Sequence, residues 1–381
     1  MNEFVITATR SMRKYAARVA GDLAKFPRFA AQADSINGVN ALTTDRFADG
    51  EMEVTVSDHG SVESLHGRDV ILFTSCARND AGIAVEEAKI ELYHTVDALK
   101  RSQAERIIVF EPFVSCSRSD RTTRRSSVGL WVHFKTLGSL GADHIVTYQL
   151  HSDKSKSMLD PTACLINDVP ALTLLKKYLC DTYIRDLKTL EEEVRPNWAF
   201  CSVDAGGEKL TRRFANAFMA PLVVAHKQRD YSKSNSIESI NILSACPIEG
   251  KVLWIVDDMV DTAGSVATLI RALAPFHPKE INIIAIHALF SPPAGERLSR
   301  LSAEGLLKHI IVTDTVHCAT GAYANGACGE TDIPNLEVVP SAGLSAKVVG
   351  AIVTNNSVSK LTPPFNAEAY FKAPGLFNVD R

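Results

Sequence analysis

Hydrophobic and polar positions along this chain follow two alternating periods. Short runs rich in Val, Ile and Leu recur, each long enough for one buried strand, and between them apolar residues return every three or four positions, as on one face of a helix. Strands are expected at residues 4–7, 69–74, 106–110, 144–148, 198–202, 222–225, 252–256, 281–288 and 309–312. Helices are expected at residues 12–23, 84–102, 130–140, 170–190, 208–217, 266–274 and 341–353.

This alternation predicts an α/β fold in which parallel sheets carry helices on both faces. Ligands of such sheets bind at the carboxyl ends of the strands. A length of 381 residues suits two domains, each with its own core. Asp-Pro and Asn-Asp-Val-Pro sequences interrupt the pattern within residues 160–170, so we expect domains at residues 1–165 and 166–381.

Composition narrows the class of protein. Hydrophobic residues make up 46% and charged residues 22%, which is ordinary for a globular chain. The net charge of -3 favours neither nucleic acid nor a membrane surface as partner, so an anionic ligand needs a local site. The 8 cysteines are scattered without a Cys-x-x-Cys pair, which indicates reduced residues. The sequence shows neither a signal-peptide pattern nor a membrane-spanning run, so a cytoplasmic location is expected.

The segment from residue 252 to residue 265 is the most informative. An apolar run ends in two carboxylates, Asp257 and Asp258, and a short turn leads into a helical pattern. The turn consists of Asp261, Thr262, Ala263, Gly264 and Ser265. Its N–H and hydroxyl groups can surround one anion, with Gly264 expected to supply a positive φ. The paired acids suit sugar hydroxyls or a divalent cation. We therefore predict a ribose-phosphate site here, and the absence of Gly-Lys-Ser/Thr excludes a Walker A loop.

A second glycine turn follows the expected strand at residues 198–202. It consists of Asp204, Ala205, Gly206 and Gly207. The two glycines let backbone N–H groups approach a pyrophosphate, and Asp204 can meet Mg2+.

A basic pair, Lys227 and Arg229, follows the next expected strand and precedes a polar stretch at residues 230–241 that we expect to be mobile. In an extended chain, residues two apart point the same way. The pair could therefore clamp a triphosphate as a lid closes and stabilise charge in the transition state.

The N-terminal half carries nucleotide-like features. Phe47 offers a ring face to a nucleobase, and Asp49 and Glu51 can accept hydrogen bonds from its amino group. Arg118 is a bidentate donor suited to ATP and belongs to a local basic cluster. His151 follows the strand at residues 144–148. Taken singly, these features also fit an ordinary turn, a solvated basic loop and a structural histidine.

Taken together and in order, these motifs resemble those of the ribose-phosphate pyrophosphokinases, the PRPP synthetases. Residues 252–265 resemble the PRPP-binding motif that this family shares with type I phosphoribosyltransferases, and residues 202–209 resemble its Asp-Ala-Gly-Gly loop. Residues 46–51 resemble its adenine loop and residues 225–229 its catalytic flexible loop. The resemblance implies two phosphoribosyltransferase-like (type I) domains, each a mainly parallel sheet flanked by helices.

The implied reaction transfers the β,γ-diphosphoryl group of ATP to the anomeric hydroxyl of ribose 5-phosphate, giving PRPP and AMP. The implied partners are these two substrates, Mg2+ as cofactor, and further copies of the chain in a dimer-based homo-oligomer, possibly a hexamer. The resemblance assigns the catalytic role to Lys227 and Arg229, the metal to His151 and Asp204, ATP to Phe47, Asp49, Glu51, Arg118 and Ser119, pyrophosphate to Asp204, Ala205, Gly206 and Gly207, and ribose 5-phosphate to Asp257, Asp258 and residues 261–265.

Two alternatives remain. The first is a catalytically silent regulatory subunit, suggested by Gln149 where the family carries Asp, by Ser119 where it carries Gln, and by the altered segment 126–133. Retention of both basic residues, His151 and Asp204 argues against it. The second is a phosphoribosyltransferase that consumes PRPP, which leaves a whole additional α/β half unexplained.

Overall fold

The computed structural model describes residues 3–56, 64–77, 79, 81–122, 125–229, 237–316 and 333–373. The chain forms two compact units. Unit 1 comprises Met1–Pro170, Thr315–Ala319 and Pro340–Thr362, and unit 2 comprises Ala171–Asp314, Thr320–Val339 and Pro363–Arg381.

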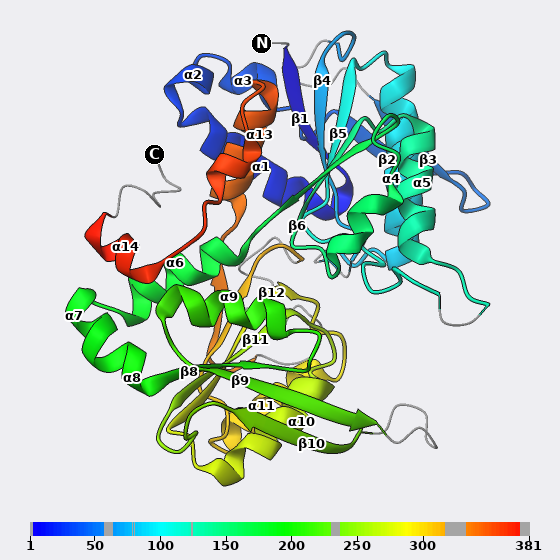
Figure 1. Cartoon of the computed structure of the whole chain (residues 1–381). Coiled ribbons are helices and arrows are strands. Elements are labelled where there is room, and N and C mark those ends of the chain that lie inside the picture. The colour runs from blue at the N-terminus through cyan, green and yellow to red at the C-terminus, as the bar shows by residue number, and fades with distance from the viewer. Residues whose placement is uncertain are drawn as a thin grey trace. The chain divides into compact units, whose positions relative to one another are not determined.

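Unit 1 is built on a five-stranded parallel sheet (Figure 1). Its strands, in spatial order, are β1 (Phe4–Ala8), β4 (Asp69–Phe73), β5 (Arg106–Phe110), β6 (His144–Tyr148) and β7 (Leu165–Val169). A separate antiparallel hairpin consists of β2 (Leu42–Arg46) and β3 (Met52–Val56). The helices of the unit are η1 (Arg10–Met12), α1 (Arg13–Ala24), α2 (Pro27–Ala30), α3 (Ala33–Ile36), α4 (Val85–Arg101), α5 (Gly129–Leu140), η2 (Asp153–Met158), α13 (Ala342–Val353) and η5 (Val358–Leu361).

Helices cover both faces of this sheet, because all five residues of β1 and of β4 are buried and each strand must pack on two sides. One face packs against apolar residues of α4 and α5. On the other face, Phe73 stacks on Phe110 with ring centroids 4.7 Å apart, and Tyr15 of α1 lies 5.7 Å from Phe73. The α/β class expected from the alternating pattern is confirmed.

Helix α13 returns to unit 1 although it is far from the rest of the unit in sequence. It packs along α1 (Figure 1). The hydroxyl of Tyr15 lies 2.7 Å from the hydroxyls of both Ser341 and Ser345, and the Tyr148 hydroxyl lies 2.7 Å from that of Ser345. These buried hydroxyls satisfy one another. The expected division at residues 165/166 assigned this helix to the second domain, whereas the structure divides the chain after Pro170 and brings residues 340–362 back.

Unit 2 is built on a seven-stranded sheet in which only β10, at one edge, is antiparallel among the described strands. Its strands, in spatial order, are β10 (Ile237–Ser244), β9 (Leu222–Arg229), β8 (Trp198–Ser202), β11 (Val252–Val260), β12 (Glu280–Ala288), β13 (Ile310–Thr313) and β14 (Leu336–Val339). Its helices are α6 (Leu172–Tyr183), α7 (Leu187–Thr189), the π-helical turn η3 (Leu190–Val194), α8 (Arg195–Asn197), α9 (Glu208–Phe218), α10 (Gly264–Leu273), η4 (Ala274–Phe276), α11 (Ala294–Ala303) and α14 (Ala367–Lys372).

Two features of unit 2 differ from the expectations. The helix expected at residues 170–190 ends at Tyr183, and short helical turns follow it. Strand β10, which pairs with β9, was not predicted. Polar and apolar residues are mixed along this edge strand, so it lacks the continuous apolar run that identified the central strands. Among the described helices, none is long and apolar enough to cross a membrane.

Candidate active site

The loops with the strongest sequence motifs leave the sheet of unit 2 at a topological switch point. Strands β8 and β11 are neighbours, but the chain passes from β8 to β9 on one side and from β11 to β12 on the other. The loops that follow β8 and β11 therefore diverge, and open α/β sheets commonly bind their ligands at such a point. Asp204 and the turn at residues 261–265 lie in these two loops.

The turn at residues 261–265 has the backbone conformation of an anion site. Ala263 is left-handed, with φ 57° and ψ 10°, and it precedes the first residue of α10 without a side-chain cap on that helix. A left-handed residue followed by helical ones turns successive N–H groups toward one point. We expected Gly264 to supply the positive φ, and this was wrong because Ala263 supplies it. Gly264 has a different reason to lack a side chain: a Cβ there would lie 3.2 Å from Nη1 of Arg297.

Two carboxylates stand at the end of β11, beside this turn. Asp257 and Asp258 are both half-buried, and the Asp258 N–H donates to Oδ1 of Asp257 at 2.9 Å. Burial, followed by the charges of Asp258 and Asp204, raises the pKa of Asp257 well above its ordinary value. A concentration of negative charge of this kind is relieved by a cation or by hydroxyl donors, which a metal-bound sugar phosphate would bring.

Asp204 is positioned by its own loop. Its Oδ1 accepts a hydrogen bond from the Gly207 N–H at 3.0 Å, and a Cβ at Gly206 would lie 3.2 Å from the same oxygen. Ala205 and Gly206 are exposed, and Gly207 directly precedes α9. The glycine at position 206 therefore lets the backbone pass close to the carboxylate that the sequence assigned to a metal.

The carboxylates of unit 2 fit Mg2+ that arrives with phosphate. In the described part of the chain, no cluster of three or more His, Cys, Asp or Glu side chains is arranged to hold a metal by itself. Mg2+ commonly takes only one or two protein carboxylates and completes its shell with waters and substrate phosphates. The carboxylate oxygens of Asp204, the metal-binding residue expected in this unit, are hard donors of that kind.

Lys227 and Arg229 belong to the last residues of β9. Their backbone is extended and pairs with β10, with Lys227 opposite Ile240 and Arg229 opposite Ile237. The catalytic role expected for their side chains lies outside the part that the structure describes.

In unit 1, the β2–β3 hairpin presents the expected adenine loop. The Gly50 N–H donates to the Phe47 carbonyl at 2.9 Å, the Glu51 N–H donates to Oδ1 of Asp49 at 3.0 Å, and Gly50 has φ 93°. A tight hairpin loop needs glycine at such a position. Phe47 is 53% exposed and lines a hollow of about 380 Å3 together with Tyr93 and other residues of the hairpin, α4 and α5. The ring face is thus open to a nucleobase.

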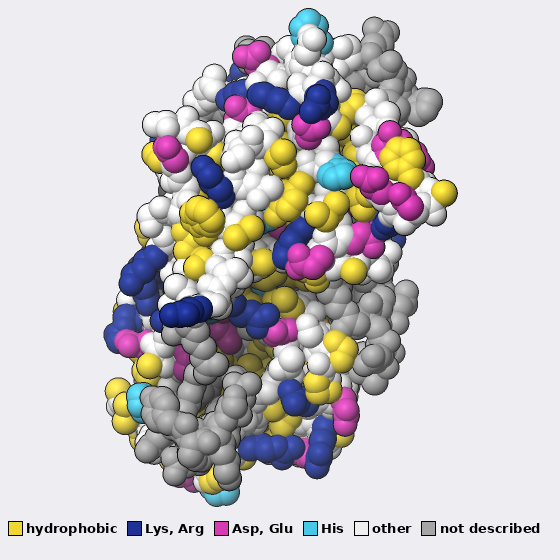
Figure 2. All heavy atoms as spheres, turned by 90° about the vertical axis from the view of Figure 1, so that its right-hand side faces the viewer, with side chains coloured by type: hydrophobic (Ala, Val, Ile, Leu, Met, Phe, Trp, Pro, Cys, Tyr) yellow, Lys and Arg dark blue, Asp and Glu magenta, His cyan; other side chains and the backbone are white. Residues whose placement is uncertain are grey.

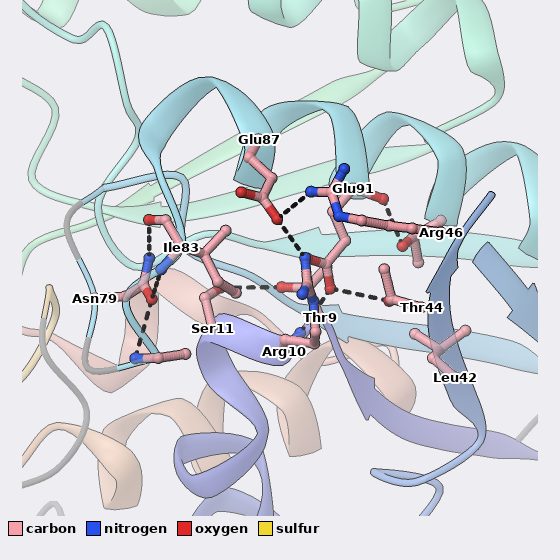
Figure 3. A network of polar contacts seen from close by, with 12 residues as sticks. Thr9, Arg10, Ser11, Leu42, Thr44, Arg46, Asn79, Ile83, Glu87 and Glu91 are labelled. Carbon is pink, nitrogen blue, oxygen red and sulfur yellow. Dashed lines mark hydrogen bonds and ion pairs between the residues drawn. The ribbon is translucent and has the colours of Figure 1, made fainter. Parts of the chain in front are cut away.

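An ion-pair network attaches this hairpin to α4 (Figure 3). Arg46 contacts the Glu87 carboxylate at 2.6 Å, and Arg10 contacts the same carboxylate at 3.0 Å. Hydrogen bonds from Arg10, and then from Arg46, lower the pKa of Glu87. Arg10 also contacts the buried Glu91 at 2.9 Å, and the Thr44 hydroxyl donates to Glu91 at 3.4 Å. These ion pairs therefore hold the hairpin loop in place against α4, and the sequence motifs did not indicate them.

The loop after β5 holds the other residues expected to bind ATP. Arg118 is exposed. Ser119 is used by the fold: its Oγ accepts the Gly129 N–H at 2.9 Å and its carbonyl accepts the Leu130 N–H at 3.2 Å. These bonds satisfy N–H groups in the first turn of α5, which would otherwise lack partners. The Ser119 side chain therefore supports the start of α5.

Three hydrogen-bonded side chains are buried beneath this loop, and the sequence did not indicate them. Nε2 of His133 lies 2.9 Å from Oε2 of Glu111, and the Tyr93 hydroxyl lies 3.0 Å from Nδ1 of His133. Glu111 and His133 are almost fully buried, and the Ser115 N–H donates to Glu111 at 3.3 Å. The three side chains tie β5, α4 and α5 together below the expected nucleotide loop. Their partnership is tertiary, so neither spacing nor composition indicated it.

His151 follows β6 and is exposed. Gln149, which stands where the family carries Asp, is left-handed with φ 42°. The next residue, Leu150, donates its N–H to Oδ1 of Asp168 on β7 at 3.0 Å, and Lys156 contacts Asp168 at 3.0 Å. A carboxylate from the neighbouring strand therefore supports this turn.

Charge on the surface is mixed. In the face seen in Figure 2, Lys and Arg side chains are interspersed with Asp and Glu, and the described residues form no broad field of one sign. An anionic ligand must therefore be attracted by local groups, such as the turn at residues 261–265.

Comparisons with known proteins agree with this geometry. Residues 4–141 match the model of the N-terminal domain of ribose phosphate pyrophosphokinase, and residues 184–320 match that of the phosphoribosyl transferase domain. The ribose-phosphate pyrophosphokinase of Corynebacterium efficiens is 30% identical over 325 residues, which cover 85% of this chain and 88% of the relative. That of Prochlorococcus marinus is 30% identical over 340 residues, covering 88% and 90%.

A solved structure shows the same fold. The crystal structure of phosphoribosylpyrophosphate synthetase from Mycobacterium smegmatis matches with a TM-score of 0.74 and 25% sequence identity, covering 93% of this chain and all of the other. The resemblance inferred from the motifs is confirmed.

Proposed function

Because this chain belongs to the ribose-phosphate pyrophosphokinase family, we propose that it transfers the β,γ-diphosphoryl group of ATP to the anomeric hydroxyl of ribose 5-phosphate. It is an enzyme of PRPP synthesis. The single observation that carries the proposal is the pairing of an anion turn with adjacent carboxylates at the β8/β11 switch point, in a chain similar over most of its length to pyrophosphokinases.

In the reaction, the anomeric oxygen forms a bond to the β phosphorus, the bond between that phosphorus and the α,β-bridging oxygen breaks, and AMP leaves. The hydroxyl loses its proton. Such a transfer depends on positioning and on charge stabilisation, because the protein forms no covalent bond to the substrate.

The residues divide this work. The N–H groups of the turn at residues 261–265 bind the 5-phosphate, and Asp257 and Asp258 orient the ribose through its hydroxyls. The loop of Asp204 to Gly207 receives pyrophosphate. The hairpin loop with Phe47 holds the adenine, and Arg118 and Ser119 belong to the nucleotide loop. Asp204 would hold Mg2+ together with phosphate oxygens, and the ion would neutralise part of the triphosphate charge. His151 is the second metal-binding residue that the resemblance implies.

Lys227 and Arg229 stabilise the charge that develops on the transferred group. The first test measures AMP and PRPP together, from ATP, Mg2+ and ribose 5-phosphate. The double variant Lys227→Ala, Arg229→Ala is compared with Lys279→Ala, a matched lysine before β12 that has no assigned role. We expect both products from the native protein and from the control, and neither from the double variant.

The alternatives predict different products. A catalytically silent subunit would bind ribose 5-phosphate without forming AMP, and that result would overturn the proposal. A phosphoribosyltransferase would release pyrophosphate from PRPP and a nucleobase, with no requirement for ATP.

The chain further acts as a homo-oligomer built from dimers. Ile90 of α4 and Trp131 and Val132 of α5 are 45%, 50% and 45% exposed, respectively. Large apolar side chains are a feature of association surfaces where they form a contiguous patch. Sedimentation velocity tests this, and a monomer at micromolar concentration would contradict it.

A further inference from the structure

We propose that Arg297 is a positioning residue for the phosphate turn at residues 261–265: it orients the Ala263 N–H toward the phosphate and places a positive charge beside it. The inference rests on the proposed function of that turn. Arg297 lies in the first turns of α11 and was not indicated by any sequence motif.

The central contact is a hydrogen bond to the backbone. Nη1 of Arg297 donates to the carbonyl of Thr262 at 2.8 Å. This carbonyl and the Ala263 N–H belong to one planar peptide group, and in a trans peptide they point in opposite directions. Because the guanidinium holds the carbonyl on one side, the N–H is directed to the other side. The N–H of a residue in the left-handed conformation is one of the successive N–H groups that an anion nest uses.

The turn needs such a support. Ala263 adopts φ 57° although it is not glycine, a conformation that persists only where surrounding contacts determine it. The helix that follows begins without a side-chain cap. The contact from Arg297 is therefore one of the interactions that hold the turn in its anion-binding conformation.

Arg297 is itself held in place. The N–H groups of Leu289 and Phe290 both donate to the Val260 carbonyl at 3.0 Å, which ties the end of β12 to the end of β11. Leu298 and Leu301 of α11 are buried in the core of unit 2. The guanidinium thus reaches the turn from a rigid helix, so it arrives in a defined position without ordering a flexible segment.

Gly264 provides a second, independent observation. Its φ is not positive, so the backbone alone would accept alanine. A Cβ at this position would lie 3.2 Å from Nη1 of Arg297. The glycine therefore makes room for the guanidinium. That close approach leaves the positive charge within the first turn of α10, where it reinforces the attraction of the helix N-terminus for a dianion.

The test measures KM for each substrate and kcat for Arg297→Ala and Arg297→Lys. The matched control is Arg300→Ala, on the same helix, because the Arg300 side chain is 72% exposed and pairs with Glu304. For Arg297→Ala we expect KM for ribose 5-phosphate to rise roughly 10- to 100-fold, as loss of one charge-assisted hydrogen bond implies. KM for ATP should change less than about twofold, and added guanidinium ion should restore part of the affinity. Arg297→Lys keeps the positive charge, so its KM for ribose 5-phosphate should lie between the values of the native protein and of Arg297→Ala.

A double-mutant cycle with Gly264→Ala adds a readout that a purely structural role would not move. In the native background, Gly264→Ala should raise KM for ribose 5-phosphate. In the Arg297→Ala background, Gly264→Ala should raise this KM little further, because the guanidinium with which the new Cβ interferes is already absent.

The failures are distinguishable. If Asp261→Asn raises KM for ribose 5-phosphate and Arg297→Ala behaves like Arg300→Ala, the inference is wrong and the proposed function stands. If neither affects that KM, the proposed role of the turn fails as well. If Arg297→Ala lowers the melting temperature and kcat without changing KM, the residue is structural only, which also overturns the inference.

Discussion

Replacing Lys176 by methionine should stabilise unit 2. Lys176 lies on α6 with only 6% of its surface exposed, and its ammonium is 5.1 Å from the ring centroid of Phe214 on α9. Burial, followed by the charge of Arg213, lowers the pKa of Lys176 from 10.5 to about 8. Folding therefore places a positive charge where it is poorly solvated, and an apolar side chain of similar length avoids this cost.

The size of the effect follows from the pKa. Each step of one in pKa corresponds to about 1.4 kcal/mol, so the fall to about 8 represents about 3 kcal/mol of destabilisation at neutral pH. The cation–π contact with Phe214 is lost in the variant and offsets about 0.5–2 kcal/mol of the gain. Lys176→Met should thus raise the free energy of unfolding by about 1–3 kcal/mol at pH 7.

The gain should depend on pH in one direction. The unfolded chain keeps its proton on Lys176 up to its ordinary pKa of 10.5, whereas the folded protein releases it near 8. Between these values the unfolded state binds more protons, so the stability of the native protein rises with pH. The advantage of Lys176→Met is therefore full below pH 8 and disappears as the pH approaches 10.5.

Urea denaturation followed by tryptophan fluorescence is the assay. Trp198 and Trp254 are buried in unit 2, so their emission reports its unfolding. Lys177→Met is the matched control, because this neighbour pairs with Asp181 at 2.6 Å and should gain nothing from losing its charge. A variant no more stable than the native protein at pH 7, or a gain that persists unchanged at pH 10.5, would refute the reasoning.

Three further predictions follow from the geometry. Asp257→Asn should raise the melting temperature and abolish PRPP formation. Because burial and neighbouring charges raise the pKa of this carboxyl, the gain in melting temperature should be lost as the pH falls toward the carboxyl's ordinary pKa. A gain that stays constant in a pH series of melting curves would contradict this. Arg46→Ala should raise KM for ATP roughly 3- to 10-fold through loss of the hairpin support and leave KM for ribose 5-phosphate unchanged; steady-state kinetics would reveal an equal effect on both if the reasoning fails. Ser345→Ala should cost about 1–3 kcal/mol in urea denaturation, because the buried hydroxyls of Tyr15 and Tyr148 each lose a partner.

Much of the fold could be predicted because central strands of parallel sheets are buried on both faces and must be continuously apolar. This condition identified the strands at residues 252–256 and 281–288 without any tertiary information. It failed for β10, an edge strand in which polar and apolar residues are mixed. The helix expected at residues 341–353 is present as α13, but its sequence says nothing about its packing on α1.

Some features of the candidate site could also be predicted from the sequence, and others could not. The order of acids, glycines and hydroxyl residues at residues 204–207 and 257–265 is local, so the sequence alone indicated their chemistry and the family. The roles of individual groups depend on neighbours distant in sequence. Only the tertiary structure placed the left-handed conformation at Ala263, Arg297 against the turn, and Arg10 beneath the hairpin. Backbone patterns are encoded by nearby residues, whereas the partner of a charged side chain is decided by which elements the packing of the core brings together.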